Sequence, residues 1–172
     1  MRRSTLFLFL SLLTMFAAAV AVPAAFAVNP HFVSASASVN RDGTLSVSFK
    51  EAGLGDNQLI DYRATADAAA TYVCVNNGGG HPRAANKTTV SGPVSKTGTF
   101  NSGKNGNVTA SLTLSPPPPP APDAFSCPSG QTLQLALVSY SNVAITDTTN
   151  GITESIPGTT SGCLLPNVRN AC

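Results

Sequence analysis

Residues 33–49, VSASASVNRDGTLSVSF, alternate between apolar and hydroxyl side chains on both sides of a turn sequence. Side chains that alternate with a period of two lie on opposite faces of a β-strand. Between the two runs, Asp42-Gly43 tolerates the positive φ that a tight β-hairpin requires. The stretch therefore predicts two antiparallel strands, 33–39 and 45–49, each with one apolar face.

The same alternation continues over residues 60–75, where Ile60, Tyr62 and Cys74 share one parity with a row of alanines. A strand of that length would span roughly 50 Å, which is far longer than usual. We therefore expect a bend, bulge or break near residues 67–70. Further short strands are expected at residues 88–94, 97–100, 108–114, 132–140, 143–148 and 152–156.

Several short strands, with turn sequences between them and no convincing amphipathic helix, define the fold class. Asn150-Gly151 supplies a further hairpin turn between two of these strands. We predict an all-β protein built as an antiparallel β-sandwich. An immunoglobulin-like arrangement is our first choice, and a jelly roll or a barrel fits the same pattern.

The first 27 residues have the composition of a secretory signal peptide. Arg2 and Arg3 precede an apolar run from Leu6 to Val22, and residues 25–27 (AFA) form a small-x-small cleavage site. An uncleaved membrane anchor is the alternative, because the apolar run could almost span a bilayer. The cleavage site favours export, so we expect a mature extracellular chain of residues 28–172 without a membrane span.

The mature chain is expected to carry no net charge. The protein has 10 basic and 8 acidic residues, and the leader contains two of the basic ones, Arg2 and Arg3. This balance gives no electrostatic reason to expect nucleic acid or an anionic membrane as a partner. The chain also lacks tryptophan, so a carbohydrate-binding platform of aromatic rings is poorly supplied.

Residues 116–122, PPPPPAP, predict a stiff polyproline II segment. This segment could divide two domains, or it could be a ligand for proline-reading modules, although such modules are mostly intracellular. Cys74 precedes the prolines and the other three cysteines follow them, so complete pairing needs a disulfide that crosses the prolines. We therefore predict one domain, residues 28–172, with a rigid surface loop at 116–122.

Four cysteines allow three pairings. We favour Cys74–Cys127, which ties a strand end to the segment after the prolines, and Cys163–Cys172, which closes a short C-terminal loop. Thiols of an exported chain oxidise, and such disulfides stabilise a small domain. A metal site is the alternative, but the chain lacks the closely spaced Cys and His ligands that zinc requires. We expect neither a metal nor a cofactor.

The segment from Cys74 to Pro82, CVNNGGGHP, is the most distinctive candidate for ligand binding. Asn76, Asn77 and His81 flank a glycine cluster whose backbone N–H groups could hold a ligand, and His81 could titrate near neutral pH. The glycine spacing matches neither a phosphate loop nor a dinucleotide fingerprint. This mismatch favours a plain connecting loop.

No catalytic motif stands out. A Ser-His-Asp triad would depend on His81, and no Gly-x-Ser-x-Gly sequence marks a nucleophile. The isolated carboxylates on predicted strands and turns are typical of solvated surface rather than of a glycosidase pair. Asp56-Asn57, or Asp147 with Asn150, could contact calcium, but neither pair has the dense acidic spacing of a dedicated loop.

Four short segments resemble a group of secreted proteins from bacteria of the actinomycete type. They are residues 70–79 (ATYVCVNNGG), 81–82 (HP), 84–87 (AANK) and 125–128 (FSCP). The resemblance covers most of the mature chain. It implies export and a shared fold, and it assigns no activity and no site.

We therefore expect a secreted, disulfide-stabilised β-sandwich without enzymatic activity, which binds an extracellular protein or polymer. A small hydrolase of extracellular polymers, using His81 and a nearby carboxylate, is the first alternative. A protease inhibitor that presents the proline loop to its target is the second alternative.

Overall fold

The computed structural model describes residues 29–76 and 84–172, which form eight β-strands and no helix. The all-β class is therefore confirmed. Within these ranges no helix is long and apolar enough to cross a lipid bilayer. The predicted signal peptide lies outside the described residues. The strands are β1 (His31–Val39), β2 (Leu45–Ala52), β3 (Leu59–Asn76), β4 (Ala84–Asn101), β5 (Val108–Leu114), β6 (Gln131–Asp147), β7 (Ile152–Ile156) and β8 (Thr160–Cys163).

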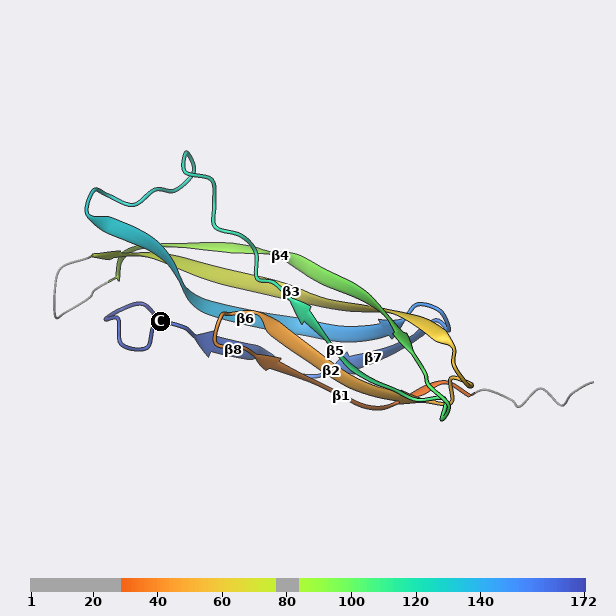
Figure 1. The fold of residues 1–172 in the computed structure, drawn as a ribbon. Coiled ribbons are helices and arrows are strands. Elements are labelled where there is room, and N and C mark those ends of the chain that lie inside the picture. The colour runs from red at the N-terminus through yellow and green to blue at the C-terminus, as the bar shows by residue number, and fades with distance from the viewer. Residues whose placement is uncertain (1–28, 77–83) are drawn as a thin grey trace, which may run out of the picture.

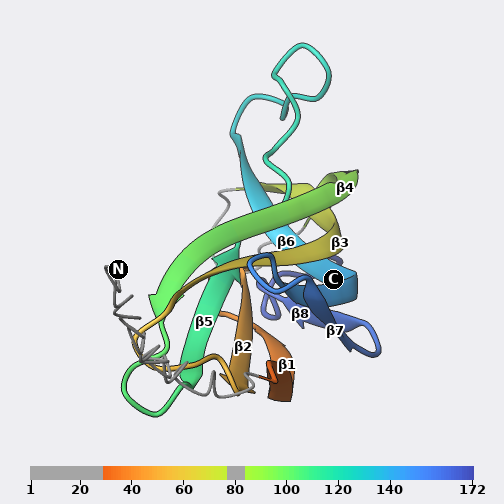
Figure 2. The same ribbon diagram turned by 90° about the vertical axis from the view of Figure 1, so that its right-hand side faces the viewer.

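The strands form two antiparallel sheets that face each other as a sandwich (Figure 1 and Figure 2). One sheet has the order β1-β2-β5, and the other has the order β4-β3-β6-β7, with β8 also paired to β6. In an immunoglobulin sandwich the first, second and fifth strands share one sheet, and the third, sixth and seventh share the other. The structure confirms the sandwich and follows the immunoglobulin-like order, with β4 placed beside β3.

The hairpin predicted from residues 33–49 joins β1 to β2. The backbone nitrogen of Asn40 donates to the oxygen of Thr44 over 2.8 Å, and Gly43 has a positive φ of 85°. This is the local conformation that the Asp-Gly pair favours. The buried apolar residues of β2 are those that the alternation predicts, namely Leu45, Val47 and Phe49.

The start of β1 departs from the predicted alternation. A shift of register between Phe32 and Ser34 turns Val33 outward, and 53% of its surface is exposed. Phe32 packs against the core in its place. A β-bulge inserts one extra residue into a strand, and this residue has no partner on the neighbouring strand. The side chains before the bulge therefore point to the opposite face from the one that simple alternation predicts. The inward position predicted for Val33 is therefore wrong.

A bend, bulge or break was expected near residues 67–70; β3 is a single strand of 18 residues without a break, and the bulges beside this region lie on its partner β6. β3 pairs with β4 without a shift of register from Leu59 to Val73. The irregularities lie in β6, which has one extra residue opposite the step from Thr65 to Asp67 and another farther along. Bulges increase local twist, so the extra residues of β6 let it stay paired with β3 along most of its length.

Two predicted pairs of short strands are each one long strand. Residues 88–94 and 97–100 are both parts of β4, and residues 132–140 and 143–148 are both largely within β6. β4 lies at the edge of its sheet and contains Pro93. An edge strand tolerates proline because the missing N–H faces away from the paired neighbour. Proline therefore does not end the strand here.

Alanine residues in the middle of β3 allow the two sheets to pack closely. The core-facing residues there are Ala64, Ala66, Ala68 and Ala70, and all are buried. Apolar side chains of β2 and β5 occupy the facing sheet. Four aromatic rings fill the core toward one end, with centroid distances from 4.5 to 6.5 Å. These rings belong to Phe32, Phe49, Tyr62 and Phe100.

A second, smaller apolar cluster covers the other face of β3 near its end. Val73 and Val75 pack there with Ala136 of β6 and with the C-terminal segment 164–172. A strand covered on both faces is apolar at every position rather than at alternate positions. This explains why the polar alternation of β3 stops at Val73.

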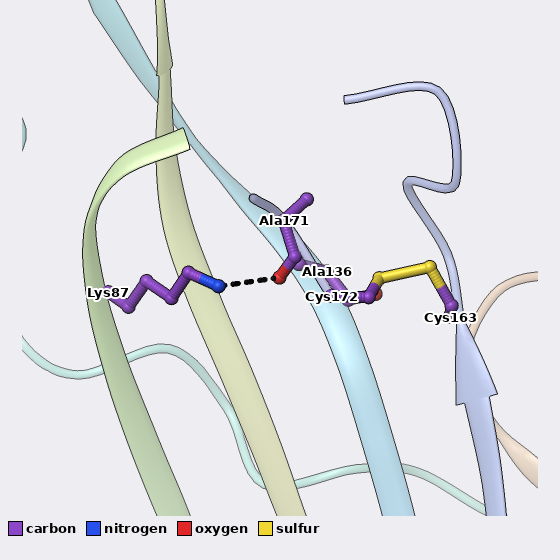
Figure 3. Close-up of a disulfide and its surroundings, with 5 residues drawn as sticks. All are labelled: Lys87, Ala136, Cys163, Ala171 and Cys172. Atoms are coloured by element: carbon purple, nitrogen blue, oxygen red, sulfur yellow. Dashed lines mark hydrogen bonds between the residues drawn. A yellow bond between two sulfur atoms is a disulfide. The ribbon is translucent and has the colours of Figure 1, made fainter. Parts of the chain in front are cut away.

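Both predicted disulfides are present, Cys74–Cys127 and Cys163–Cys172. The second one holds the C-terminal segment beside β6, as Figure 3 shows. The ammonium group of Lys87 on β4 also donates to the backbone oxygen of Ala171 over 3.3 Å. The C-terminus is therefore attached to both β8 and β4.

Candidate functional site

The connection between β5 and β6, residues 115–130, contains the predicted proline loop and projects from the sandwich. Figure 1 and Figure 2 both show its tip standing clear of the strands. Pro117 is buried and Pro120 is half-buried, whereas Pro118 and Pro119 are exposed. In a polyproline II helix every third residue lies on the same side. The loop therefore turns one proline edge to the protein and another to the surroundings.

Two contacts with the end of β3 hold this loop in place. The buried hydroxyl of Tyr72 donates to the backbone oxygen of Pro117 over 2.7 Å. Two residues farther along β3, Cys74 forms the disulfide to Cys127. Burial raises the pKa of Tyr72, so its hydroxyl keeps the proton that it donates. Tyr72 and Cys74 thus fix the two sides of one loop to one strand.

The tip of the loop is a compact turn. The backbone nitrogens of Ala124 and Phe125 both donate to the oxygen of Ala121, over 2.9 and 3.1 Å. Phe125 is half-buried, while the residues before it are exposed. We call the exposed part of this loop the proline ridge, and it consists of Pro118, Pro119, Ala121, Pro122, Asp123 and Ala124.

The predicted binding residues are only partly covered by the described structure. Asn76 is exposed at the end of β3 and lies opposite Gln131, the first residue of β6. It therefore sits at the base of the proline loop. Asn77 and His81 lie outside the described residues, so their roles remain predictions. The alternation in the sequence places Tyr72 inward, but no local signal connects it to Pro117.

Replacing Tyr72 by Phe should lower the free energy of unfolding by about 1 kcal/mol, because the Pro117 carbonyl loses its buried donor. We also expect faster cleavage of the loop in limited proteolysis under native conditions. Tyr140→Phe is the matched control, since its buried hydroxyl donates to the backbone oxygen of Gly43 in the β1–β2 turn and not to the loop. Equal rates of loop cleavage in both variants would show that Tyr72 does not hold the loop.

At the opposite end of β3, three polar side chains are fully buried: Glu51 of β2, Tyr62 of β3 and Asp147 of β6. Within the described residues, neither carboxylate oxygen of Glu51 has a well-formed hydrogen bond, and the same holds for the hydroxyl of Tyr62. The alternation along β2 predicts that Glu51 points inward, because it shares the parity of the inward-pointing Phe49. Charged residues are rarely buried, so ordinary residue preferences do not point to Glu51.

Burial raises the pKa of Glu51 to about 7. The nearby hydroxyl of Tyr62 opposes this rise, and the charge of Asp147 adds to it. Burial also raises the pKa of Tyr62 far above its usual range, and Glu51 contributes to that rise. A raised carboxyl pKa is common in active sites, but these groups are inaccessible to a polymeric substrate. The cluster therefore does not support the hydrolase alternative.

Two carboxylates, Asp147 and Asp67, serve the local structure. Asp147 accepts hydrogen bonds from the backbone nitrogens of Thr149 and Asn150 and from the Asn150 side chain, so it caps the turn after β6. Asp67 accepts from the side chain of Asn142. Across residues 29–76 and 84–172, no three His, Cys, Asp or Glu side chains are grouped to hold a metal ion.

The larger sheet has a shallow hollow on its outer face. Its volume is about 390 Å³, and short side chains of β3, β4 and β6 line it. Among these are Asp67, Ser91 and Ser139. A specific ligand site usually combines an apolar pocket with converging polar groups, and this open surface offers neither depth nor aromatic rings. The proline ridge is therefore a better candidate for a binding site than this hollow.

Comparison of the chain with protein-family models, with curated proteins and with solved structures gives no match. The candidate site is therefore identified from the geometry of the chain itself. That geometry selects the proline ridge, which is exposed and held at both sides by β3.

Proposed function

We propose that this protein is a secreted, non-enzymatic interaction module that binds an extracellular protein through the proline ridge. One observation carries the proposal: the ridge is exposed, yet Tyr72 and Cys74 fasten the loop on both sides. Binding residues are often placed on loops that a rigid scaffold positions. The sandwich supplies such a scaffold for this loop.

The chemistry of the ridge favours a protein partner. Prolines are already restricted in the free state, so they lose little conformational entropy when a partner binds them. Asp123 is the only charged residue between residues 115 and 130, so the contact surface is mainly apolar. Partners that bind polyproline segments usually supply a groove lined with aromatic side chains. We infer a partner with such a groove.

Export is part of the proposal. It is supported by the charged, apolar and small-residue order of residues 1–27 and by the two disulfides. Disulfides form and persist mainly in oxidising compartments. A fold closed by two such bridges, with no free cysteine among its described residues, suits the extracellular space.

The proposal is tested by capturing envelope and culture-medium proteins of the source organism on immobilised residues 28–172, followed by calorimetric titration of the purified partner. A variant with Pro118, Pro119 and Pro122 replaced by Ser should bind at least about tenfold more weakly, which is about 1.4 kcal/mol. The matched control is Pro157→Ser, at an exposed proline between β7 and β8. Equal affinity for all three proteins would refute binding through the ridge.

A further inference from the structure

Glu51 and Asp147 place two carboxyl groups from different sheets beside the buried Tyr62: Asp147 lies opposite Tyr62 in the β3–β6 pairing, and both Tyr62 and Asp147 act on Glu51. Glu51 belongs to β2 of the three-stranded sheet, and Asp147 ends β6 of the larger sheet. Both side chains are 0% exposed. Two ionised carboxylates in a buried site repel each other, and each loses hydration. Their protonation state therefore affects how tightly the two sheets pack at this end of the sandwich.

The two carboxyl groups differ in how their surroundings compensate a negative charge. Three N–H donors of the following turn reach Asp147: the backbone of Thr149, and the backbone and side chain of Asn150. In the described structure, no donor of good geometry reaches either oxygen of Glu51. A buried carboxylate without donors is expensive, whereas a neutral carboxyl group can itself donate a hydrogen bond. Glu51 is therefore the group that should carry a proton.

We propose that Glu51 and Asp147 bind one proton between them, and that this proton holds the two sheets together at this end of the sandwich. The proton comes from solvent and resides on Glu51, whose hydroxyl can donate to a free lone pair of Asp147. Its release to solvent leaves two buried negative charges facing each other. Like charges in a shared site raise one of the two pKa values in just this way.

Every charged or titratable group that acts on Glu51 can be named. Burial has the largest effect and raises its pKa to about 7; Tyr62 of β3 lowers the value, Asp147 of β6 raises it, and His31 of β1 lowers it slightly. Tyr62 itself stays neutral, because its own pKa lies far above the usual range. Among the fully buried groups Glu51, Tyr62 and Asp147, the proton exchanged near neutral pH therefore belongs to the carboxyl pair.

This assignment predicts that stability falls as pH rises. A carboxyl group with a higher pKa in the folded state binds its proton more tightly when folded. With an ordinary value of 4.5 and a folded value of about 7, the contribution of Glu51 to stability is greatest below pH 4.5, decreases up to about pH 7 and is constant above that. The folding equilibrium constant should fall roughly 300-fold over this window, since each pKa unit is a factor of ten.

The most direct test is carbon-13 NMR of protein labelled at the glutamate carboxyl carbons. After leader removal the chain contains only Glu51 and Glu154, so two signals are expected. Glu51→Gln assigns them, and the signal of exposed Glu154 is the internal reference. A Glu51 signal that titrates near pH 7 supports the proposal. A midpoint below about pH 5 would overturn it, and this needs no variant to fold.

Urea unfolding between about pH 4.5 and pH 8 gives the second readout. The wild type and the matched control Glu154→Gln should lose stability across this range, whereas Glu51→Gln should show little change. An unchanged slope in Glu51→Gln would contradict the proposal.

Binding of a cation by the carboxyl pair is a rival explanation, and addition of calcium at about 5 mM tests it. If calcium at pH 8 stabilises the wild type but not Glu51→Gln, the pair is a cation site and the proton assignment is wrong.

Discussion

Removal of the Cys74–Cys127 disulfide, by changing both cysteines to Ala, should lower the free energy of unfolding by about 4 kcal/mol. The bridge joins residues separated by 53 positions, and a longer closed loop restricts the unfolded chain more strongly. Cys74 is also fully buried at the end of β3. We expect the midpoint of urea unfolding to fall sharply without loss of the β-sheet circular dichroism signal at low urea.

The second disulfide is the matched control for this prediction. Cys163 and Cys172 are separated by 9 positions, so the same chain-entropy argument gives about 2.5 kcal/mol for their double replacement by Ala. The longer bridge should therefore matter more. If the Cys74–Cys127 variant proved as stable as the Cys163–Cys172 variant, or more stable, the view that this bridge braces the domain would be wrong.

Replacing Ala68 by Leu should cost about 2–3 kcal/mol of unfolding free energy. Ala68 belongs to the row of core-facing alanines on β3 and is only 4% exposed. A close-packed core does not accommodate three additional carbon atoms without strain, so we expect neighbouring side chains to leave their preferred rotamers. Urea unfolding monitored by tyrosine fluorescence measures the loss.

The adjacent residue supplies the control for Ala68→Leu. Ala69 lies on the opposite face of β3 and lines the shallow outer hollow rather than the core. Ala69→Leu should therefore change the free energy of unfolding by less than about 0.5 kcal/mol. Similar losses for both variants would mean that the inward and outward faces of β3 have been assigned incorrectly.

The sequence was sufficient for the features that depend on near neighbours. Alternation predicted the buried face of β2 and most of that of β3, and Asp42-Gly43 predicted the first turn. The favoured disulfide pairing is also the one in the structure, but four cysteines allow three pairings and the sequence alone did not decide among them. The signals for strand faces and turns lie within one strand or one turn.

Features that depend on a distant partner were not predictable in this way. The bulges that β3 appeared to need occur in β6, because register is decided jointly by two strands. The continuity of β4 through Pro93 depends on its position at the sheet edge, which only the topology reveals. Similarly, Val73 and Val75 are covered by a C-terminal segment far away in the sequence.

The candidate site shows the same division. Residues 116–122 were expected to form a stiff surface loop, and they lie in the connection between β5 and β6; Asn76, proposed as a binding residue, lies at the base of that connection. The sequence did not show that Tyr72 holds Pro117, because 45 residues separate the two partners. The inward position of Glu51 was predictable, because Glu51 shares the parity of Phe49 on β2. A buried acidic side chain nevertheless conflicts with ordinary residue preferences.

The central claim is that the sandwich holds the proline ridge as a rigid, exposed surface. Backbone amide order parameters from nitrogen-15 relaxation, measured at Ala121, Asp123 and Ala124 of residues 28–172, test it most directly. We predict values near 0.85, the level of rigid backbone, in the oxidised protein and a clear decrease in the Cys74→Ala/Cys127→Ala variant. Values below about 0.6 in the oxidised protein would contradict the claim, because the ridge would then be flexible.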